Sequence, residues 1–219
     1  MWRASSCKNL RTALALVLGL GVLPAAAVGA PTPPAAPPAA PSADMAMGRP
    51  DAPVTLVEYG SDTCSHCARF AREVFPDLKK TYIDTGKVRY VFREFPTAPE
   101  DLAVAGFLLA RCAGGAKYFD VLNALFAAQS TAQTGRDFLL AGAAAGGLDE
   151  ARMNACVSDP QAIEALSARV ALAVEKDKIA STPSFIVNGT PLPPGEKTFA
   201  DLKTVIDPLI AAHGRKRAP

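Results

Sequence analysis

The sequence predicts an α/β fold in which a βαβ unit and a ββα unit are separated by an all-helical insertion. Three observations carry this prediction. A β-branched strand, an amphipathic helix and a second apolar strand follow one another from about 54 to 95. Helical segments dominate from about 100 to 180. A strand, a tight turn, a returning strand and a final helix then close the chain.

The first unit is organised around a cysteine motif. The strand at 54–59 is rich in β-branched residues and runs into a turn at 60–63, and Cys64-Ser65-His66-Cys67 follows at once. Apolar residues then recur at helical spacing up to Gly86, so the motif is expected to open an amphipathic helix that Pro76 kinks. The residues with this spacing are Phe70, Ala71, Val74, Leu78 and Tyr82. A buried strand is expected at 88–95.

The insertion and the second unit show equally local signals. Helices are expected at 102–112, 118–128 and 163–178, and the last has Asp159 as its cap with Pro160 in the first turn. After them, the sequence predicts a strand at 184–187, a hairpin turn at Asn188-Gly189, an edge strand at 190–192 and a helix at 198–212.

Length and composition limit the function classes. The chain has 219 residues, 49% of them hydrophobic, which suits one packed domain and excludes a large multidomain machine. Without Arg3, Lys8 and Arg11 at the start, the 23 basic residues become 20 against 21 acidic residues, so nothing indicates nucleic-acid binding. A short basic tail follows residue 212, which we interpret as a solvated terminus; contact with anionic lipid or a partner is the alternative.

The N-terminus reads as an export signal. A basic start precedes an apolar run at 12–23 and small residues, with cleavage expected after Ala27 rather than Ala30, because Pro31 suits a peptidase poorly. An uncleaved anchor is the alternative, although the run is short for a membrane span. Either way the folded part leaves the cytosol.

The resulting organisation has five parts. A Pro- and Ala-rich stretch after the signal lacks an apolar face and is expected to be a semi-rigid tether. We expect a signal at 1–27, the tether at 28–46, one domain at 47–98 and 180–212, the helical insertion at 99–179 and the basic tail at 213–219. Cys7 lies in the signal, so four cysteines remain in a compartment where disulfides persist.

The motif suits thiol–disulfide exchange, which needs an exposed thiolate and a second thiol nearby. At a helix N-terminus, free N–H groups and the helix dipole stabilise the Cys64 thiolate, so Cys64 is the expected nucleophile and Cys67 the resolving thiol. His66 can hold a positive charge beside the thiolate, which lowers the pKa of Cys64 and favours an oxidant.

Metal and haem sites are the alternatives for this motif. A structural zinc site needs further ligands, and no second pair or His cluster follows at ligand spacing. Covalent haem needs His directly after the second cysteine, where Ala68 stands. We expect neither a metal nor an organic cofactor, because a redox-active disulfide carries the electrons.

Two further motifs make the chain resemble a known family. The segment at 57–59, the cysteine motif and the distant Thr182-Pro183 before a strand resemble the DsbA family of thiol oxidants over about 47–212. The resemblance implies a thioredoxin-like fold with a helical domain inserted between its halves. It also implies that Pro183 is cis and faces the cysteines, and that Thr182 pairs its backbone with a substrate peptide. An ordinary strand-starting proline is the alternative.

The resemblance also suggests roles for other residues. Glu58 matches the family's partly buried acid, which exchanges protons with Cys67, although an ordinary strand-end carboxylate is the alternative. Some similar proteins have a second bridge, and two spare cysteines usually pair in an oxidising compartment, so Cys112 and Cys156 are expected to form a structural disulfide. Such a bridge is worth about 4 kcal/mol on the chain-entropy model. Two separate buried thiols are the alternative.

The leading hypothesis is a monomeric, exported thiol:disulfide oxidoreductase. It donates the Cys64–Cys67 disulfide to exported proteins with free thiols through a mixed disulfide at Cys64, and a membrane partner reoxidises it. A disulfide isomerase or reductase is the enzymatic rival, but such proteins often have a dimerisation domain where this chain has a tether. A metallochaperone using the motif, or a redox-inert peptide-binding chaperone, is the non-enzymatic rival.

Overall fold

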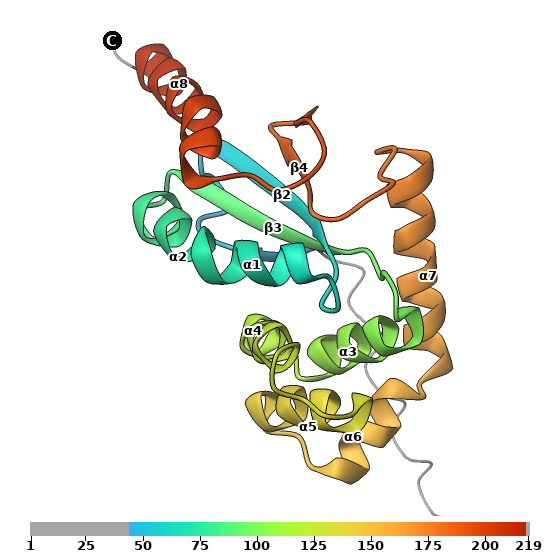
Figure 1. Cartoon of the computed structure of the whole chain (residues 1–219). Coiled ribbons are helices and arrows are strands. Elements are labelled where there is room, and N and C mark those ends of the chain that lie inside the picture. Colours follow the sequence, from blue (N-terminus) through green and yellow to red (C-terminus); the bar gives the residue numbers. More distant parts are fainter. Residues whose placement is uncertain (1–43, 218–219) are drawn as a thin grey trace, which may run out of the picture. The chain divides into compact units, whose positions relative to one another are not determined.

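A five-stranded mixed sheet forms the centre of the part of the chain that the structure describes (Figure 1). The structure is a computed structural model that describes residues 44–217, so the expected signal, Cys7 and most of the expected tether lie outside the described residues. The strand order is β1-β3-β2-β4-β5. The strands are β1 (Met45–Met47), β2 (Val54–Gly60), β3 (Val88–Glu94), β4 (Ser184–Val187) and β5 (Thr190–Pro191).

The pairing of the strands divides the sheet into the two expected units. Strands β2 and β3 are parallel, so the chain must cross over between them, and it does so through helix α1 (Ser65–Glu73). Strand β4 pairs with β2 in antiparallel register, and β5 returns along β4. The predicted order of a βαβ unit and a ββα unit is therefore confirmed.

The predicted kink in the first helix is a break. Helix α1 ends before Val74, α2 (Phe75–Leu78) begins with Pro76 in its first turn, and a π-helical segment, η1 (Lys79–Ile83), follows. Pro76 lacks the N–H that an uninterrupted helix would need, whereas a first turn leaves that position without a partner. The same residues thus form two helical pieces in place of one bent helix.

Helices cover both faces of the sheet. Side chains of Leu56, Tyr90 and Phe185 share one hydrophobic core with α1 and with α8 (Phe199–Arg217). On the opposite face, Ala173 of α7 (Pro160–Glu175) packs with a smaller apolar cluster. Because neighbouring residues of β2 point to opposite faces, the strand supplies side chains to both cores. Helices α1, α7 and α8 all belong to segments that the sequence predicts to be helical.

Five helices lie in the chain between β3 and β4 and form the expected insertion (Figure 1). The sequence singles out α3, α4 and α7 but misses α5 and α6, whose residues are rich in Ala and small or polar side chains. The start of α5 nevertheless has a capping box, in which Thr134 and Asp137 satisfy each other's backbone N–H groups. Besides α7, these helices are α3 (Glu100–Cys112), α4 (Tyr118–Ala128), α5 (Gly135–Gly146) and α6 (Glu150–Val157).

The fold extends beyond both expected ends. Strand β1 pairs with β3, and Asp44 accepts hydrogen bonds of 2.9 and 3.0 Å from Arg93, so the predicted start at residue 47 is too late. Helix α8 continues to Arg217, so the predicted helix end at 212 is too early. A three-residue edge strand has too few residues to show a sequence period, and the basic residues after 212 are good helix formers.

Two features bind the insertion to the sheet and to itself. Glu94, at the end of β3, is buried and accepts hydrogen bonds from Arg111 (2.9 Å), Tyr118 (3.0 Å) and Arg169 (3.3 Å). These partners come from three insertion helices, so one carboxylate joins the sheet to each of them. A disulfide links Cys112 of α3 to Cys156 of α6, with Cα atoms 5.9 Å apart.

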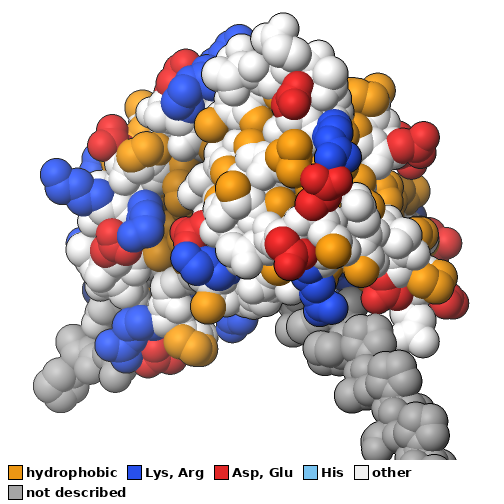
Figure 2. All heavy atoms as spheres, turned by 90° about the horizontal axis from the view of Figure 1, so that it is seen from below, with side chains coloured by type: hydrophobic (Ala, Val, Ile, Leu, Met, Phe, Trp, Pro, Cys, Tyr) orange, Lys and Arg blue, Asp and Glu red, His pale blue; other side chains and the backbone are white. Residues whose placement is uncertain are grey.

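The outer surface of the insertion has a mixed charge. Seen from below the view of Figure 1, Lys and Arg side chains lie among Asp and Glu side chains and scattered apolar ones (Figure 2). Within residues 44–217, no helix combines the length and the apolar character that crossing a membrane requires.

Candidate active site

The cysteine motif lies where β2 passes into α1. Cys64 occupies the N-cap position of α1, and its own N–H donates to the Ser61 carbonyl (3.1 Å) in the turn before it. Its carbonyl accepts the first helical hydrogen bond, from Ala68 (3.0 Å). The predicted placement of the motif at a helix start is thus what the structure shows, and the N–H groups of His66 and Cys67 in the first turn contact the Cys64 sulfur.

Two other segments hold this turn. Thr97, in the β3–α3 connection, donates its N–H to Ser61 Oγ (3.1 Å) and accepts a hydrogen bond at its carbonyl from Thr63 Oγ1 (3.0 Å). Gln129, at the end of α4, donates from Nε2 to the carbonyls of Asp62 (2.7 Å) and Cys64 (3.2 Å). The helical insertion therefore fixes the active-site turn directly. Sequence reasoning missed Gln129, because no motif marks a lone glutamine.

The two cysteines differ in exposure and in acidity. Cys64 is half-buried, whereas Cys67 is completely buried, and both are free thiols. A hydrogen bond from the Cys67 thiol, together with contacts from the Thr182 side chain and the N–H groups of Cys67 and His66, lowers the pKa of Cys64 to about 5 despite partial burial. The same hydrogen bond and burial raise the pKa of Cys67 far above its ordinary value. At neutral pH the reduced pair is one thiolate and one thiol.

The loop before β4 faces the Cys64 sulfur. The Thr182–Pro183 peptide bond is cis, and the thiol form of Cys64 donates from Sγ to the Thr182 carbonyl (3.6 Å). Strand β4 begins directly after this loop and pairs with the end of β2, which brings the two segments together. The residues that the resemblance singled out, Thr182 and Pro183, therefore lie beside the nucleophile.

His66 has a different environment from the expected one. Its side chain is 57% exposed, and Nδ1 contacts Glu196 Oε1, from the loop between β5 and α8. The hydrogen bond through which His66 lowers the pKa of Cys64 comes from its backbone N–H. The expectation that the imidazole itself stabilises the thiolate is therefore not what this geometry shows. Glu196 could not be found from the sequence, since it stands in a proline-rich loop 130 residues away.

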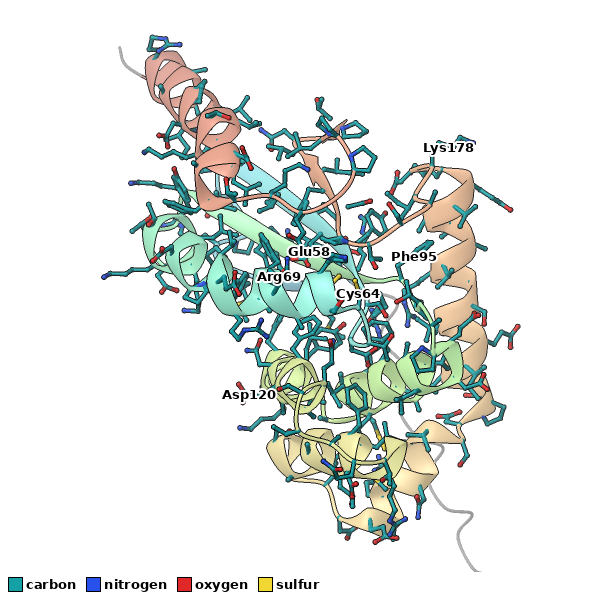
Figure 3. The ribbon with its side chains drawn as sticks, viewed as in Figure 1. Glu58, Cys64, Arg69, Phe95, Asp120 and Lys178 are labelled. Carbon is teal, nitrogen blue, oxygen red and sulfur yellow. A yellow bond between two sulfur atoms is a disulfide. The ribbon has the colours of Figure 1, made fainter. Side chains whose placement is uncertain are left out.

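Glu58 lies on β2, and Figure 3 shows it near Cys64, whose charge acts on it. Its carboxyl is buried and accepts a hydrogen bond from Tyr90 Oη (2.7 Å). Burial raises the pKa of Glu58 to about 8, against the effect of the Tyr90 hydrogen bond and with a smaller contribution from the Cys64 charge. Glu58 in turn raises the pKa of Cys67. The position is that of a group able to exchange a proton near Cys67, as the resemblance implies.

Asp62 is a second buried acid, which sequence reasoning missed. Neither of its carboxyl oxygens has a hydrogen-bond partner among the described residues, and burial holds its pKa well above the ordinary value. A Cβ at position 106 would lie only 1.9 Å from Asp62 Oδ2, so Gly106 of α3 leaves the space that this carboxyl occupies. Asp62 is therefore a buried acid with a raised pKa, packed between the active-site turn and the insertion.

The described residues contain no group of three or more His, Cys, Asp or Glu side chains placed to hold a metal ion. The arrangement that they do form is a dithiol with one acidic and one buried sulfur, beside a cis-proline loop and above a buried carboxyl. Such a dithiol can form a disulfide and can exchange it with another thiol through the more accessible sulfur.

Comparison with known families agrees with this geometry. A family model described as "Thioredoxin" matches residues 41–208. Two relatives, in Rickettsia bellii and Rickettsia felis, carry the description "Putative protein-disulfide oxidoreductase". They are 37% identical over 150 residues and 33% identical over 177 residues. These alignments cover 67% and 79% of this chain but only 57% and 62% of the relatives, so the chain spans about three fifths of their length.

A solved structure matches over nearly its whole length. The crystal structure of α-DsbA1 from Wolbachia pipientis is 30% identical to this chain, with a TM-score of 0.72. The match covers 80% of this chain and 94% of the Wolbachia protein. The predicted thioredoxin-like fold with inserted helices is confirmed by this similarity.

Proposed function

The chain belongs to the DsbA-like family of thioredoxin-fold proteins, and on that premise we propose that it is an exported thiol:disulfide oxidase. It donates the Cys64–Cys67 disulfide to client proteins that have free thiols. The observation that carries the proposal is the difference between the two sulfurs: Cys64 is accessible with a pKa lowered to about 5, and Cys67 is buried with a raised pKa. This difference fixes which sulfur a client meets.

The transfer takes two steps. A client thiolate attacks Cys64 Sγ, a mixed disulfide forms, and the Cys64–Cys67 bond breaks with the electron pair on Cys67, which takes up a proton. The client's second thiolate then attacks the client sulfur that is bonded to Cys64. A client disulfide forms, and Cys64 leaves as a thiolate. The client has lost two electrons and the protein dithiol has gained them. Because the Cys64 thiolate is stable at neutral pH, it is a good leaving group in the second step.

We propose that Glu58 is the group that gives a proton to Cys67. Cys67 is too buried to exchange with bulk water directly, and the charge of Glu58 raises the pKa of Cys67. With a pKa of about 8, Glu58 is mostly protonated at pH 7 and has a proton to give. In the first step it therefore supplies the proton that Cys67 takes up.

The cis-proline loop is the proposed site of client binding. Thr182 is oriented toward Cys64, and a client strand lying along it can pair with its backbone while the client cysteine meets the Cys64 sulfur. In the thiol form of Cys64, the Thr182 carbonyl accepts a hydrogen bond from Sγ. In the oxidised form that a client meets, Cys64 has no S–H, so this carbonyl is free to accept from a client N–H.

Catalytic turnover requires an oxidant, and we propose a membrane-bound thiol oxidase as the partner that restores the Cys64–Cys67 disulfide. The proposal includes export by the expected N-terminal signal, because a disulfide donor needs a compartment that is not reducing. It also includes action as a monomer without an organic cofactor, since the disulfide itself carries the two electrons.

The test is a single-turnover oxidation of a reduced client. Pre-oxidised protein is mixed with a reduced two-cysteine protein, and the disulfides of both are followed by alkylation and mass spectrometry. We expect one client disulfide per protein disulfide consumed. The variant Cys67→Ser, mixed with an oxidised client, should accumulate a mixed disulfide at Cys64, whereas the matched variant Cys64→Ser should not. A client that stays reduced, or a mixed disulfide at Cys67, contradicts the proposal.

A further inference from the structure

An acidic side chain from the far end of the chain contacts the cysteine motif. Glu196 lies in the loop between β5 and α8, and its Oε1 contacts both His66 Nδ1 and Arg69 Nη1, the latter at 3.2 Å. His66 and Arg69 stand three residues apart on α1, so their side chains lie on one face of the helix. A single carboxylate thus joins both positive side chains next to the active-site cysteines.

The position of Glu196 is set by the fold. The preceding residue, Gly195, donates its N–H to the Pro183 carbonyl (3.3 Å), which ties the loop to the cis-proline segment. The following residue, Lys197, folds back and donates from Nζ to the carbonyls of Gly195 (3.0 Å) and Glu196 (3.1 Å). The loop is therefore held on both sides of Glu196, and the carboxylate meets α1 at a fixed place.

This contact determines where the His66 charge is used. Among the described residues, Glu196 is the polar partner of the His66 ring, while His66 reaches Cys64 through its backbone N–H. We propose that Glu196 is a positioning residue that pairs with the His66 imidazole, neutralises its charge and so limits how strongly the Cys64 thiolate is stabilised. The inference rests on the proposed function, and it means that the β5–α8 loop sets the oxidising power of this protein.

The sign of the effect follows from the charges around Cys64. Cys67 and the buried Glu58 interact with Cys64, and the surface cluster of His66, Arg69 and Glu196 lies next to the cysteine motif. With Glu196 ionised, one negative charge offsets the positive charge of the cluster. In the variant Glu196→Gln, that positive charge has no counter-charge. An unopposed positive charge must then favour the thiolate.

The test is a titration of the Cys64 thiolate by its ultraviolet absorbance in the reduced protein. In Glu196→Gln the pKa of Cys64 should fall by about 0.2 to 0.7 units, the range expected for charges at exposed positions. In His66→Asn, where Glu196 keeps its charge, the pKa should rise by a similar amount. The double variant should return close to the unmodified protein. Glu73→Gln, the same change on an exposed acid of α1, should leave the pKa unchanged.

The opposite sign distinguishes the rival role. If Glu196 instead orients His66 to support the thiolate, Glu196→Gln raises the pKa of Cys64, and that result, or no change, overturns the inference. If the loop contact had a purely structural role, the two single variants would not shift the pKa of Cys64 in opposite directions. The titration needs no client and no partner, so a failure of the proposed oxidase activity would be seen separately, in the client assay with the unmodified protein.

Discussion

At the scale of single residues, the chemistry depends on two sulfurs that experience opposite environments. Cys64 receives hydrogen bonds at the start of a helix, and Cys67 is buried one turn further along. The reduced state therefore holds a stable thiolate, and stabilising the reduced state makes the disulfide a better oxidant.

The acidity of Cys64 can be measured through its reactivity. The alkylation rate of Cys64 in the reduced protein should rise with pH to a plateau, with its midpoint near the pKa of about 5, because only the thiolate reacts. Cys67 should stay unmodified in the folded protein over the same range. Peptide mapping by mass spectrometry reports both sites. A midpoint near 8.5, the value of an ordinary thiol, is incompatible with the site described above.

Glu58 should make stability depend on pH. Its pKa is about 8 in the folded protein and about 4.3 when unfolded, so its cost is absent below pH 4.3 and grows as pH rises to 8. Glu58→Gln keeps an acceptor for Tyr90 and removes the charge. The reduced variant should therefore gain stability relative to the unmodified protein as pH rises, up to about 5 kcal/mol. Urea unfolding at several pH values measures this gain, and equal slopes with pH would refute the assignment.

The residues of the site divide into those that local sequence can reveal and those that it cannot. The cysteines and Thr182-Pro183 were singled out because short motifs mark them, and the structure brings them together. Glu196 and Gln129 carry no such mark, since each acts through a contact made across the folded chain. His66 was singled out, but its side-chain partner could not be known before that loop was placed.

At the scale of elements, the active-site turn is held by the helical insertion. Gln129 of the α4 end donates to two carbonyls of the turn, and neither carbonyl has another side-chain donor among the described residues. Sequence periodicity located α4 and the strands on either side of the insertion, β3 and β4, because regular elements have a clear pattern. It missed β1, which is three residues long, and α5 and α6, whose residues are rich in alanine and in small or polar side chains.

Removal of the Gln129 amide should loosen the turn. Gln129→Ala leaves the Asp62 carbonyl without its donor and the Cys64 carbonyl with the Ala68 N–H alone, and it should cost about 1 to 3 kcal/mol of unfolding free energy. Cys67 should also become more reactive toward alkylation, because the turn covers it less firmly. Gln133→Ala is the matched control, since Gln133 is exposed and bonds only within its own loop. Equal effects of the two substitutions would show that Gln129 does not hold the active-site turn.

At the scale of the whole described molecule, the insertion is braced by one buried carboxylate and one disulfide. Glu94 joins β3 to α3, α4 and α7, and Cys112–Cys156 closes α3 onto α6. Neither feature makes a hydrogen bond to Cys64 among the described residues, so they support the fold without taking part in the exchange. The fold class could be predicted because each half has its own local pattern. The brace at Glu94 could not, because it unites four separate elements.

The second disulfide should contribute to stability alone. Replacement of both Cys112 and Cys156 by Ala should lower the free energy of unfolding by about 4 kcal/mol, because the bridge closes a sequence separation of 44 residues. The pKa of Cys64 should stay the same. Denaturant unfolding and the thiolate titration test the two parts. A large change in the Cys64 pKa would show that the bridge also shapes the active site.

The reduction potential of the Cys64–Cys67 pair, measured at equilibrium with glutathione, tests the central claim most directly. Identification of each disulfide by mass spectrometry separates the Cys64–Cys67 pair from the Cys112–Cys156 bridge. A stabilised Cys64 thiolate predicts a potential well above the value of about −270 mV found in thioredoxin, toward the value of about −120 mV found in DsbA. A potential at or below that of thioredoxin would contradict the assignment of this protein as an oxidase.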